Sequence, residues 1–189
     1  MIGESSPVHS LQLTCRPGLL GCAIANVKPE SNDAQYQDCS VAFVATGGDS
    51  YHAEVAKAAA SCRRHMPDVP MTLFTDRAPA PGLFDRVEMI QGPGQGYIDK
   101  AALLDQITAG RVLFLDTDTY VTAPLYEVFE LLNRFEVAGA HAPWRLARDR
   151  RTHAAARIPG IPDAFAEINT GVLGFRNSPE VRRLCARWR

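Results

Sequence analysis

The chain has 189 residues, of which 46% are hydrophobic, and its formal net charge at pH 7 is −1. This length and composition are typical of one globular domain with a sizeable core, and the charge balance gives no indication of nucleic-acid binding. Five scattered cysteines without C-x-x-C spacing indicate neither a disulfide framework nor a zinc site. Reduced thiols are the simpler assumption, so we expect a cytoplasmic protein. No run approaches the ~20 apolar residues of a membrane span, so we expect no integral membrane segment.

The first 38 residues contain Pro, Ser, Asn and Gln without sustained periodicity. This composition predicts a poorly ordered N-terminal extension over residues 1–38. The pattern becomes regular from Cys39, and residues 39–189 are predicted to form the folded domain.

Strands and helices alternate along this domain. Strands are predicted at residues 40–46, 71–75, 86–90, 112–115, 136–140 and 168–175. Helices are predicted at residues 51–65, 99–107, 125–133 and 179–189. The alternation indicates an α/β fold, with a mostly parallel sheet flanked by helices.

The most informative segment is RVLFLDTDTYV, residues 111–121. Its apolar run is typical of a central strand that is covered on both faces, and Asp116 and Asp118 follow at the carboxyl end. Ligands bind at that end of open α/β sheets, and two carboxylates there suit Mg²⁺ or Mn²⁺ holding a phosphorylated substrate. A solvated turn is the alternative for a lone D-x-D tripeptide. Thr119 and Tyr120 are expected to continue the strand.

Four stretches together extend this interpretation: VAFVATGGDSY, KAALLDQI, VLFLDTDTYVTAPL and INTGVLGFRNS. In this order they resemble the GT-A fold glycosyltransferases, and are similar to the glycogenin-like, family 8 group that uses nucleotide-diphospho-sugars. The resemblance covers about residue 40 to the end of the chain. It implies transfer of a sugar from a nucleoside diphosphate, most often UDP, to a carbohydrate, lipid or protein acceptor that the sequence does not identify.

The resemblance also implies roles for single residues. Asp116 and Asp118 match the motif that binds Mn²⁺ (or Mg²⁺), where the metal neutralises the charge developing on the leaving diphosphate. Lys100 matches a lysine that pairs with Asp116 or contacts the donor, and we expect it to be a catalytic residue together with Asn169.

The remaining matches concern the nucleotide and the sugar. Thr46 and Tyr51 match the nucleotide-binding end of the first strand, where an aromatic ring stacks on the base. Asn169 and Thr170 match the N-[ST]-G that faces the donor sugar, and an amide can both donate to and accept from sugar hydroxyls. Gly171, which follows them, is expected to allow close packing. Asp76 is expected to have a structural role.

Three other functions remain open. A haloacid-dehalogenase-type phosphatase shares the motif D-x-D-x-T after an apolar run, but that motif normally sits on a first strand, and here three predicted strands precede it. A sugar-1-phosphate nucleotidyltransferase should have a G-x-G-T-R-like loop after its first strand, where this chain reads TGGDSY. A non-catalytic nucleotide-sugar-binding domain is the third.

In the glycogenin-like group a histidine well downstream of the N-[ST]-G strand completes the metal shell. Here residues 177–189 follow that strand and contain no histidine, while His141 and His153 precede it. We therefore expect a C-terminally incomplete fragment or a natural short form, with weak Mn²⁺-assisted nucleotide binding and little transfer.

Overall fold

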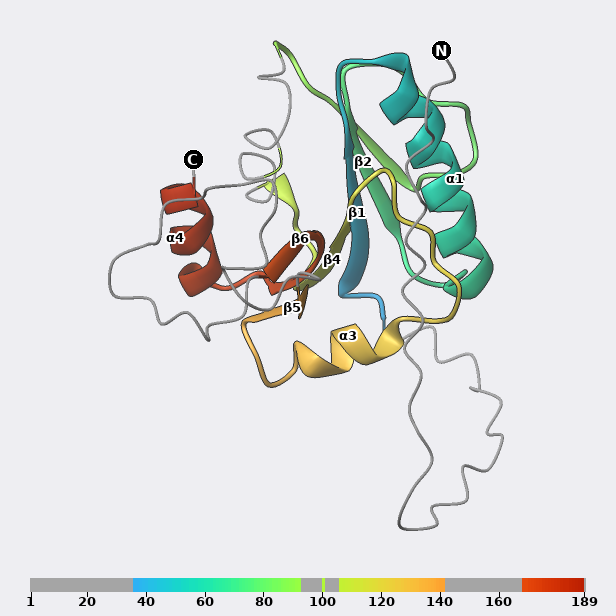
Figure 1. The fold of residues 1–189 in the computed structure, drawn as a ribbon. Helices are drawn as coiled ribbons and strands as arrows, with labels where there is room; N and C mark the ends of the chain where they lie inside the picture. Colours follow the sequence, from blue (N-terminus) through green and yellow to red (C-terminus); the bar gives the residue numbers. More distant parts are fainter. Residues whose placement is uncertain (1–35, 93–99, 101–105, 142–167, 189) are drawn as a thin grey trace, which may run out of the picture. The chain divides into compact units, whose positions relative to one another are not determined.

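The computed structural model describes residues 36–92, 100, 106–141 and 168–188. Their strands form a six-stranded sheet in the order β3-β2-β1-β4-β6-β5 (Figure 1). The strand bounds are β1 Cys39–Ala45, β2 Met71–Thr75, β3 Arg86–Met89, β4 Arg111–Leu115, β5 Val137–His141 and β6 Ile168–Arg176. Strands β1 to β4 pair in parallel, whereas β6 is antiparallel to both β4 and β5. The predicted mostly parallel sheet is confirmed, with β6 as the reversed strand.

The two central strands are β1 and β4, and they pair directly from Cys39 opposite Arg111 to Ala42 opposite Phe114. Both consist mainly of buried residues, because helices cover both faces of the sheet. The edge strand β3 has alternating charged side chains in Arg86 and Glu88 and is largely exposed. Charged residues on an edge strand discourage pairing with other chains.

The described helices are α1 Asp49–His65, α3 Tyr126–Leu131 and α4 Pro179–Trp188. Helix α1 has Asp49 in its first turn and Arg63, Arg64 and His65 in its last turn, charges that complement the helix dipole. None of the helices in the described part of the chain is long and apolar enough to cross a membrane.

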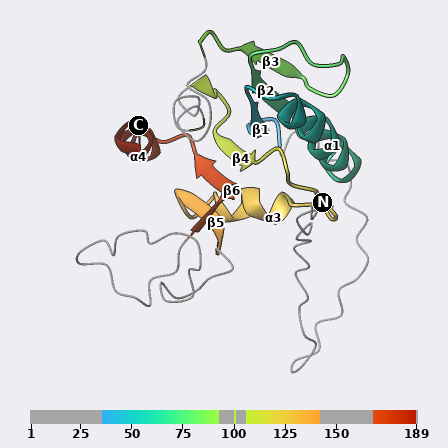
Figure 2. The ribbon, with the colours of Figure 1, turned by 45° about the horizontal axis from the view of Figure 1, so that its top comes forward.

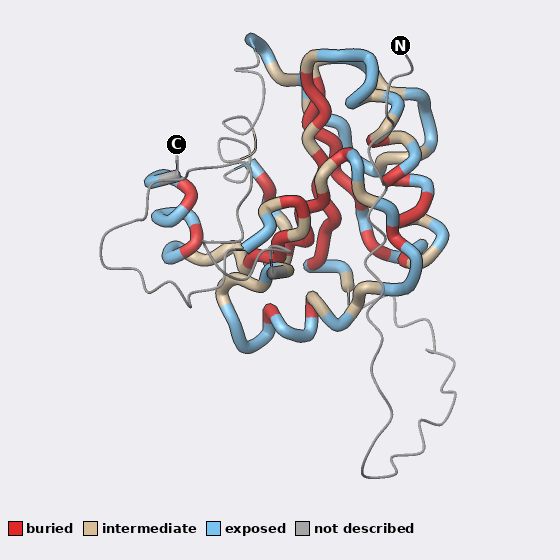
Figure 3. Tube along the Cα trace, viewed as in Figure 1, coloured by how far each residue is buried: buried red, intermediate tan, exposed pale blue. Residues whose placement is uncertain are grey.

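Buried residues run along the central strands of the sheet (Figure 3). Side chains alternate between the two faces of the sheet, so the core has two parts. On one face, Val55 and Cys62 of α1 and Phe129 of α3 pack against Phe43 and Leu113. On the other face, a second cluster includes residues of α4 and of β1, β2, β4 and β6, namely Val181, Cys185, Ala42, Phe74, Phe114 and Phe175. Helices α1 and α4 therefore lie on opposite sides of the sheet (Figure 2).

Two predictions from the sequence fall largely outside the described residues. They are residues 1–35 of the extension predicted over residues 1–38, and most of the helix predicted at residues 99–107. The division at residue 38 stays a prediction, although β1 does begin at Cys39.

Candidate functional site

The strand order reverses between β1 and β4. From β1 the chain continues to β2 on one side, and β4 lies on the other side. The carboxyl ends of β1 and β4 are therefore neighbours at a topological switch point, which is the place where open α/β sheets bind ligands. Thr46 follows β1 directly and Asp116 follows β4 directly.

The D-x-D segment is a tight turn. The backbone N–H and the hydroxyl of Thr119 both donate to the carbonyl of Asp116, at 3.1 and 2.7 Å. The prediction that Thr119 and Tyr120 continue the strand is therefore wrong, because β4 ends at Leu115. Side-chain bonding of a threonine to a nearby backbone group competes with strand pairing, and apolar periodicity cannot reveal it.

Asp116 forms an ion pair with Lys100, whose ammonium also lies 5.6 Å from the ring centroid of Phe114. The side chains of Lys100 and Asp116 are 19% and 24% exposed. Burial raises the pKa of Asp116, the bond to Lys100 lowers it, and the nearby negative charge of Asp118 raises it, with a net upward shift. A bound cation would favour the ionised form of Asp116, which the neighbouring charge of Asp118 disfavours.

A cavity of about 490 Å³ opens above this switch point. Its volume lies within the ~300–1,000 Å³ typical of small-molecule sites. The lining residues come from the end of β1, the start of α1, Lys100 and the D-x-D turn, and are Val44, Thr46, Gly47, Gly48, Tyr51, Glu54, Lys100, Asp116, Thr117 and Asp118. The structure thus brings together five of the residues predicted from the sequence, although Asn169 and Thr170 are not among those that line the cavity.

Asn169 instead connects to the site through Gly171. Its side-chain oxygen accepts the N–H of Gly171 at 2.8 Å, and the carbonyl of Gly171 accepts the N–H of Asp116 at 2.9 Å. A Cβ on Gly171 would lie 3.0 Å from Oδ2 of Asp116. The close packing predicted for Gly171 is therefore present, and it is directed at a cavity carboxylate.

The pairing of β5 with β6 is irregular beside this contact. Gly139 lies opposite Leu173, but the next residue, Ala140, lies opposite Asn169. The bulge in β6 re-aims the backbone next to Asp116, and bulges of this kind are common beside functional sites.

The other end of the cavity is a glycine turn after β1. Gly47 has a φ of 91°, which is the left-handed region that favours glycine. Its N–H donates to Oδ2 of Asp76 at 2.8 Å, and His52 Nε2 lies 3.1 Å from Oδ1 of the same carboxylate. The N–H of Gly47 is the main cause of the lowered pKa of Asp76. Asp76 has the structural role expected for it, because its carboxylate holds this turn. The side chain of Tyr51, next to the turn, is 51% exposed.

Glu54 and Thr117 line the cavity but were not predicted from the sequence. The hydroxyl of Thr117 lies 3.3 Å from Oε2 of Glu54. The spacing of Tyr51 and Glu54, three residues apart in a helix, places both on one face and could have indicated Glu54. The role of Thr117 depends on the direction of its side chain, which the motif does not reveal.

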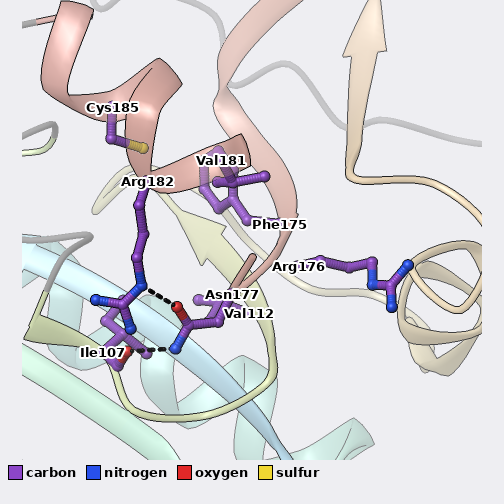
Figure 4. A pocket seen from close by; sticks show the side chains of 8 residues that line it. All are labelled: Ile107, Val112, Phe175, Arg176, Asn177, Val181, Arg182 and Cys185. Atoms are coloured by element: carbon purple, nitrogen blue, oxygen red, sulfur yellow. Dashed lines mark hydrogen bonds between the residues drawn. The ribbon is translucent and has the colours of Figure 1, made fainter. Parts of the chain in front are cut away.

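A second, much smaller cavity of about 20 Å³ lies between α4 and the sheet, on the face of the sheet opposite to α1 (Figure 4). Asn177 bridges it by donating to the carbonyl of Ile107 and accepting from Arg182, both at 2.9 Å. This volume is close to that of a single water molecule. We interpret the cavity as packing between α4 and the sheet.

The donor set of the larger cavity fits a hard divalent cation in part. Asp116 and Asp118 supply carboxylate oxygens, the ligand type that Mg²⁺ and Mn²⁺ prefer. Among the described residues, no three His, Cys, Asp or Glu side chains gather closely enough to hold a metal by themselves. Any metal here would therefore need further ligands beyond the carboxylates of this described part of the cavity.

Solved structures with the same arrangement of strands and helices include two glycosyltransferases. The glycosyltransferase GlyE of Streptococcus pneumoniae TIGR4 superposes with a TM-score of 0.54 and 21% identity, over 79% of this chain and 36% of that chain. The galactosyltransferase LgtC, in complex with donor and acceptor sugar analogs, superposes with a TM-score of 0.54 and 20% identity, over 76% of this chain and 59% of that chain.

This chain has a GT-A glycosyltransferase fold. The identities are too low to show more than the fold, and the chain spans 36% of GlyE and 59% of LgtC. No protein-family model matches the chain, and no curated protein matches it significantly. The roles of individual residues therefore depend on the geometry of the cavity.

Proposed function

We propose that this chain is a metal-dependent glycosyltransferase domain that transfers a sugar from a nucleoside diphosphate, UDP, to an acceptor. The observation that supports it best is the cavity at the switch point, where an exposed aromatic ring and two carboxylates line one space. An aromatic face suits a base, and carboxylates suit a metal that binds a diphosphate.

The charge of the cavity supports a requirement for metal. Its described lining contains the carboxylates of Glu54, Asp116 and Asp118 against the single ammonium of Lys100. A diphosphate entering alone would meet an excess of negative charge. A divalent cation held by Asp116 and Asp118 would neutralise this excess, and the diphosphate and water could supply further ligands to it. When bound, the metal stabilises the negative charge of the departing nucleoside diphosphate.

The other predicted residues fit the same model. Thr46 and Tyr51 are proposed to contact the nucleoside, because both lie on the β1 side of the cavity. Lys100 is proposed to contact the phosphates beside Asp116. Asn169 and Thr170 are proposed to reach the sugar from β6. Asn169 is exposed, and its side-chain NH₂ group can donate two hydrogen bonds.

The experiment is thermal unfolding of the 189-residue chain with UDP and UDP-sugars, in Mn²⁺ and in EDTA. At a ligand concentration of 100 Kd, binding to the native state adds ~2.7 kcal/mol of stability. For a chain of this length that raises the Tm by about 5–10 °C. We expect this increase in Mn²⁺ and a much smaller one in EDTA.

Asp118→Asn should abolish the Mn²⁺-dependent part, because an amide keeps the shape of the side chain and loses its charge. Asp68→Asn is the matched control, since Asp68 is an exposed carboxylate in the connection between α1 and β2, outside the cavity lining. An equal Tm increase in EDTA would contradict the proposal. A covalent aspartyl-phosphate on Asp116 would instead establish the phosphatase.

A further inference from the structure

The D-x-D turn is attached to helix α1. After β4, the chain runs beside α1 (Figure 1). The N–H of Val121 donates to the buried hydroxyl of Ser61 at 2.9 Å, and Thr117 meets Glu54 at 3.3 Å. Glu54 and Ser61 are seven residues apart, so they lie on one face of α1. Two contacts therefore fix the segment that contains Asp118.

The position of Asp118 depends on this attachment, because its own side chain is exposed. In the described part of the chain, no salt bridge holds its carboxylate, whereas Asp116 is paired with Lys100. The position of Asp118 is therefore set by its neighbours. Thr119 is bound to the carbonyl of Asp116, and Thr117, which is 9% exposed, turns its hydroxyl towards Glu54.

We infer that Glu54 is a positioning residue, which holds Asp118 in place for the metal by accepting the hydroxyl of Thr117. This inference rests on the proposed function. Glu54 lies on the same face of α1 as Tyr51, so it also connects the nucleoside end of the cavity to the metal end. A partner behind the metal ligands that fixes their orientation typically contributes 10–100-fold to metal affinity. The 3.3 Å contact is a long hydrogen bond, so we expect the lower end of that range.

The test compares four variants by isothermal titration with UDP, in Mn²⁺ and in EDTA. Glu54→Ala and Thr117→Val should each reduce the Mn²⁺-dependent affinity by about tenfold. Thr117→Val keeps the charge of the cavity and should leave the affinity in EDTA unchanged. Thr117→Ser restores the hydroxyl and should restore binding. The double variant, with Glu54→Ala and Thr117→Val, should lose no more than either single variant, because both remove the same contact.

Glu54→Gln separates positioning from charge. Its side-chain oxygen still accepts the hydroxyl of Thr117, so we expect most of the Mn²⁺-dependent affinity to remain. Glu127→Gln is the control for the loss of a carboxylate, since Glu127 is exposed on α3 and outside the cavity lining. If Glu54→Gln loses as much as Glu54→Ala while Thr117→Val binds normally, Glu54 acts by its charge and the inference is wrong.

Failure of the inference differs from failure of the proposed function. If the unmodified chain shows no Mn²⁺-dependent UDP binding, the proposed function fails, and the inference fails with it. If the unmodified chain binds and Glu54→Ala binds equally well, only the inference fails. Hydrogen exchange of residues 116–121 adds a measurement without ligand: Glu54→Ala should accelerate it, and unchanged exchange would show that Glu54 does not hold the turn.

Discussion

Gly171→Ala tests whether the close approach of β6 to the D-x-D turn matters for binding. Gly171 has an ordinary backbone conformation, so alanine is tolerated by its φ and meets only a steric problem. The added Cβ would lie 3.0 Å from Asp116 Oδ2 and 3.1 Å from Asn169 Oδ1. Either oxygen must move by a few tenths of an ångström.

The expected cost in stability is small. Overpacking typically costs ~1–3 kcal/mol, and replacing glycine by alanine in a strand returns ~0.5–1 kcal/mol of conformational entropy. The net change lies between about zero and about 2.5 kcal/mol, and lowers the Tm by at most about 10 °C. The loss of Mn²⁺-dependent UDP affinity should be larger than the loss of stability suggests, because the displaced group is the carboxylate of Asp116, which is also paired with Lys100.

The assay is titration of UDP in Mn²⁺, after thermal unfolding has established that the variant is folded. Gly174→Ala is the matched control in the same strand, because its Cβ would lie 2.9 Å from Cγ1 of Val128, an apolar contact in the core. We expect both variants to lose stability, and only Gly171→Ala to lose Mn²⁺-dependent affinity. A folded Gly171→Ala variant that binds UDP like the unmodified chain would refute the reasoning.

Three further predictions concern the nucleoside end and the core. Tyr51→Ala should weaken UDP binding by ~1 kcal/mol or more in titrations both with Mn²⁺ and with EDTA, and an unchanged affinity would exclude base stacking. Asp76→Ala should cost roughly 1–3 kcal/mol in denaturant unfolding and weaken UDP binding, because the N–H of Gly47 loses its acceptor. Unchanged UDP affinity would show that the Gly47 turn does not contribute to nucleotide binding. Burial raises the pKa of Asp85, but bonds from Arg63 and a backbone N–H outweigh it and lower the pKa below 3.8. The ionised Asp85 carboxylate therefore stabilises the fold above about pH 4, and this stabilisation is lost as the pH falls through the folded pKa. In denaturant unfolding, the stability advantage of the unmodified chain over Asp85→Asn should shrink towards pH 3. A constant difference between the two would contradict the shift.

The sequence by itself determined the elements and the end of the sheet at which the site lies. The mainly apolar runs of β1, β2 and β4 indicate strands buried on both faces, since central parallel strands are covered in this way. The aspartates after β4 then had to emerge at the carboxyl end. The pairing of Lys100 with Asp116 was one of the two roles that the family resemblance implied for this lysine.

Tertiary structure decided what the one-dimensional pattern cannot contain. The reversed direction of β6 leaves no trace in its periodicity, because side chains alternate in the same way in parallel and antiparallel strands. The turn at Thr119 arises from a hydroxyl that competes for a backbone carbonyl. The contact between Glu54 and Thr117 joins residues 63 positions apart, which meet only because α1 packs over the carboxyl end of β4. Long-range contacts of this kind depend on strand order and helix packing, and these are properties of the folded chain.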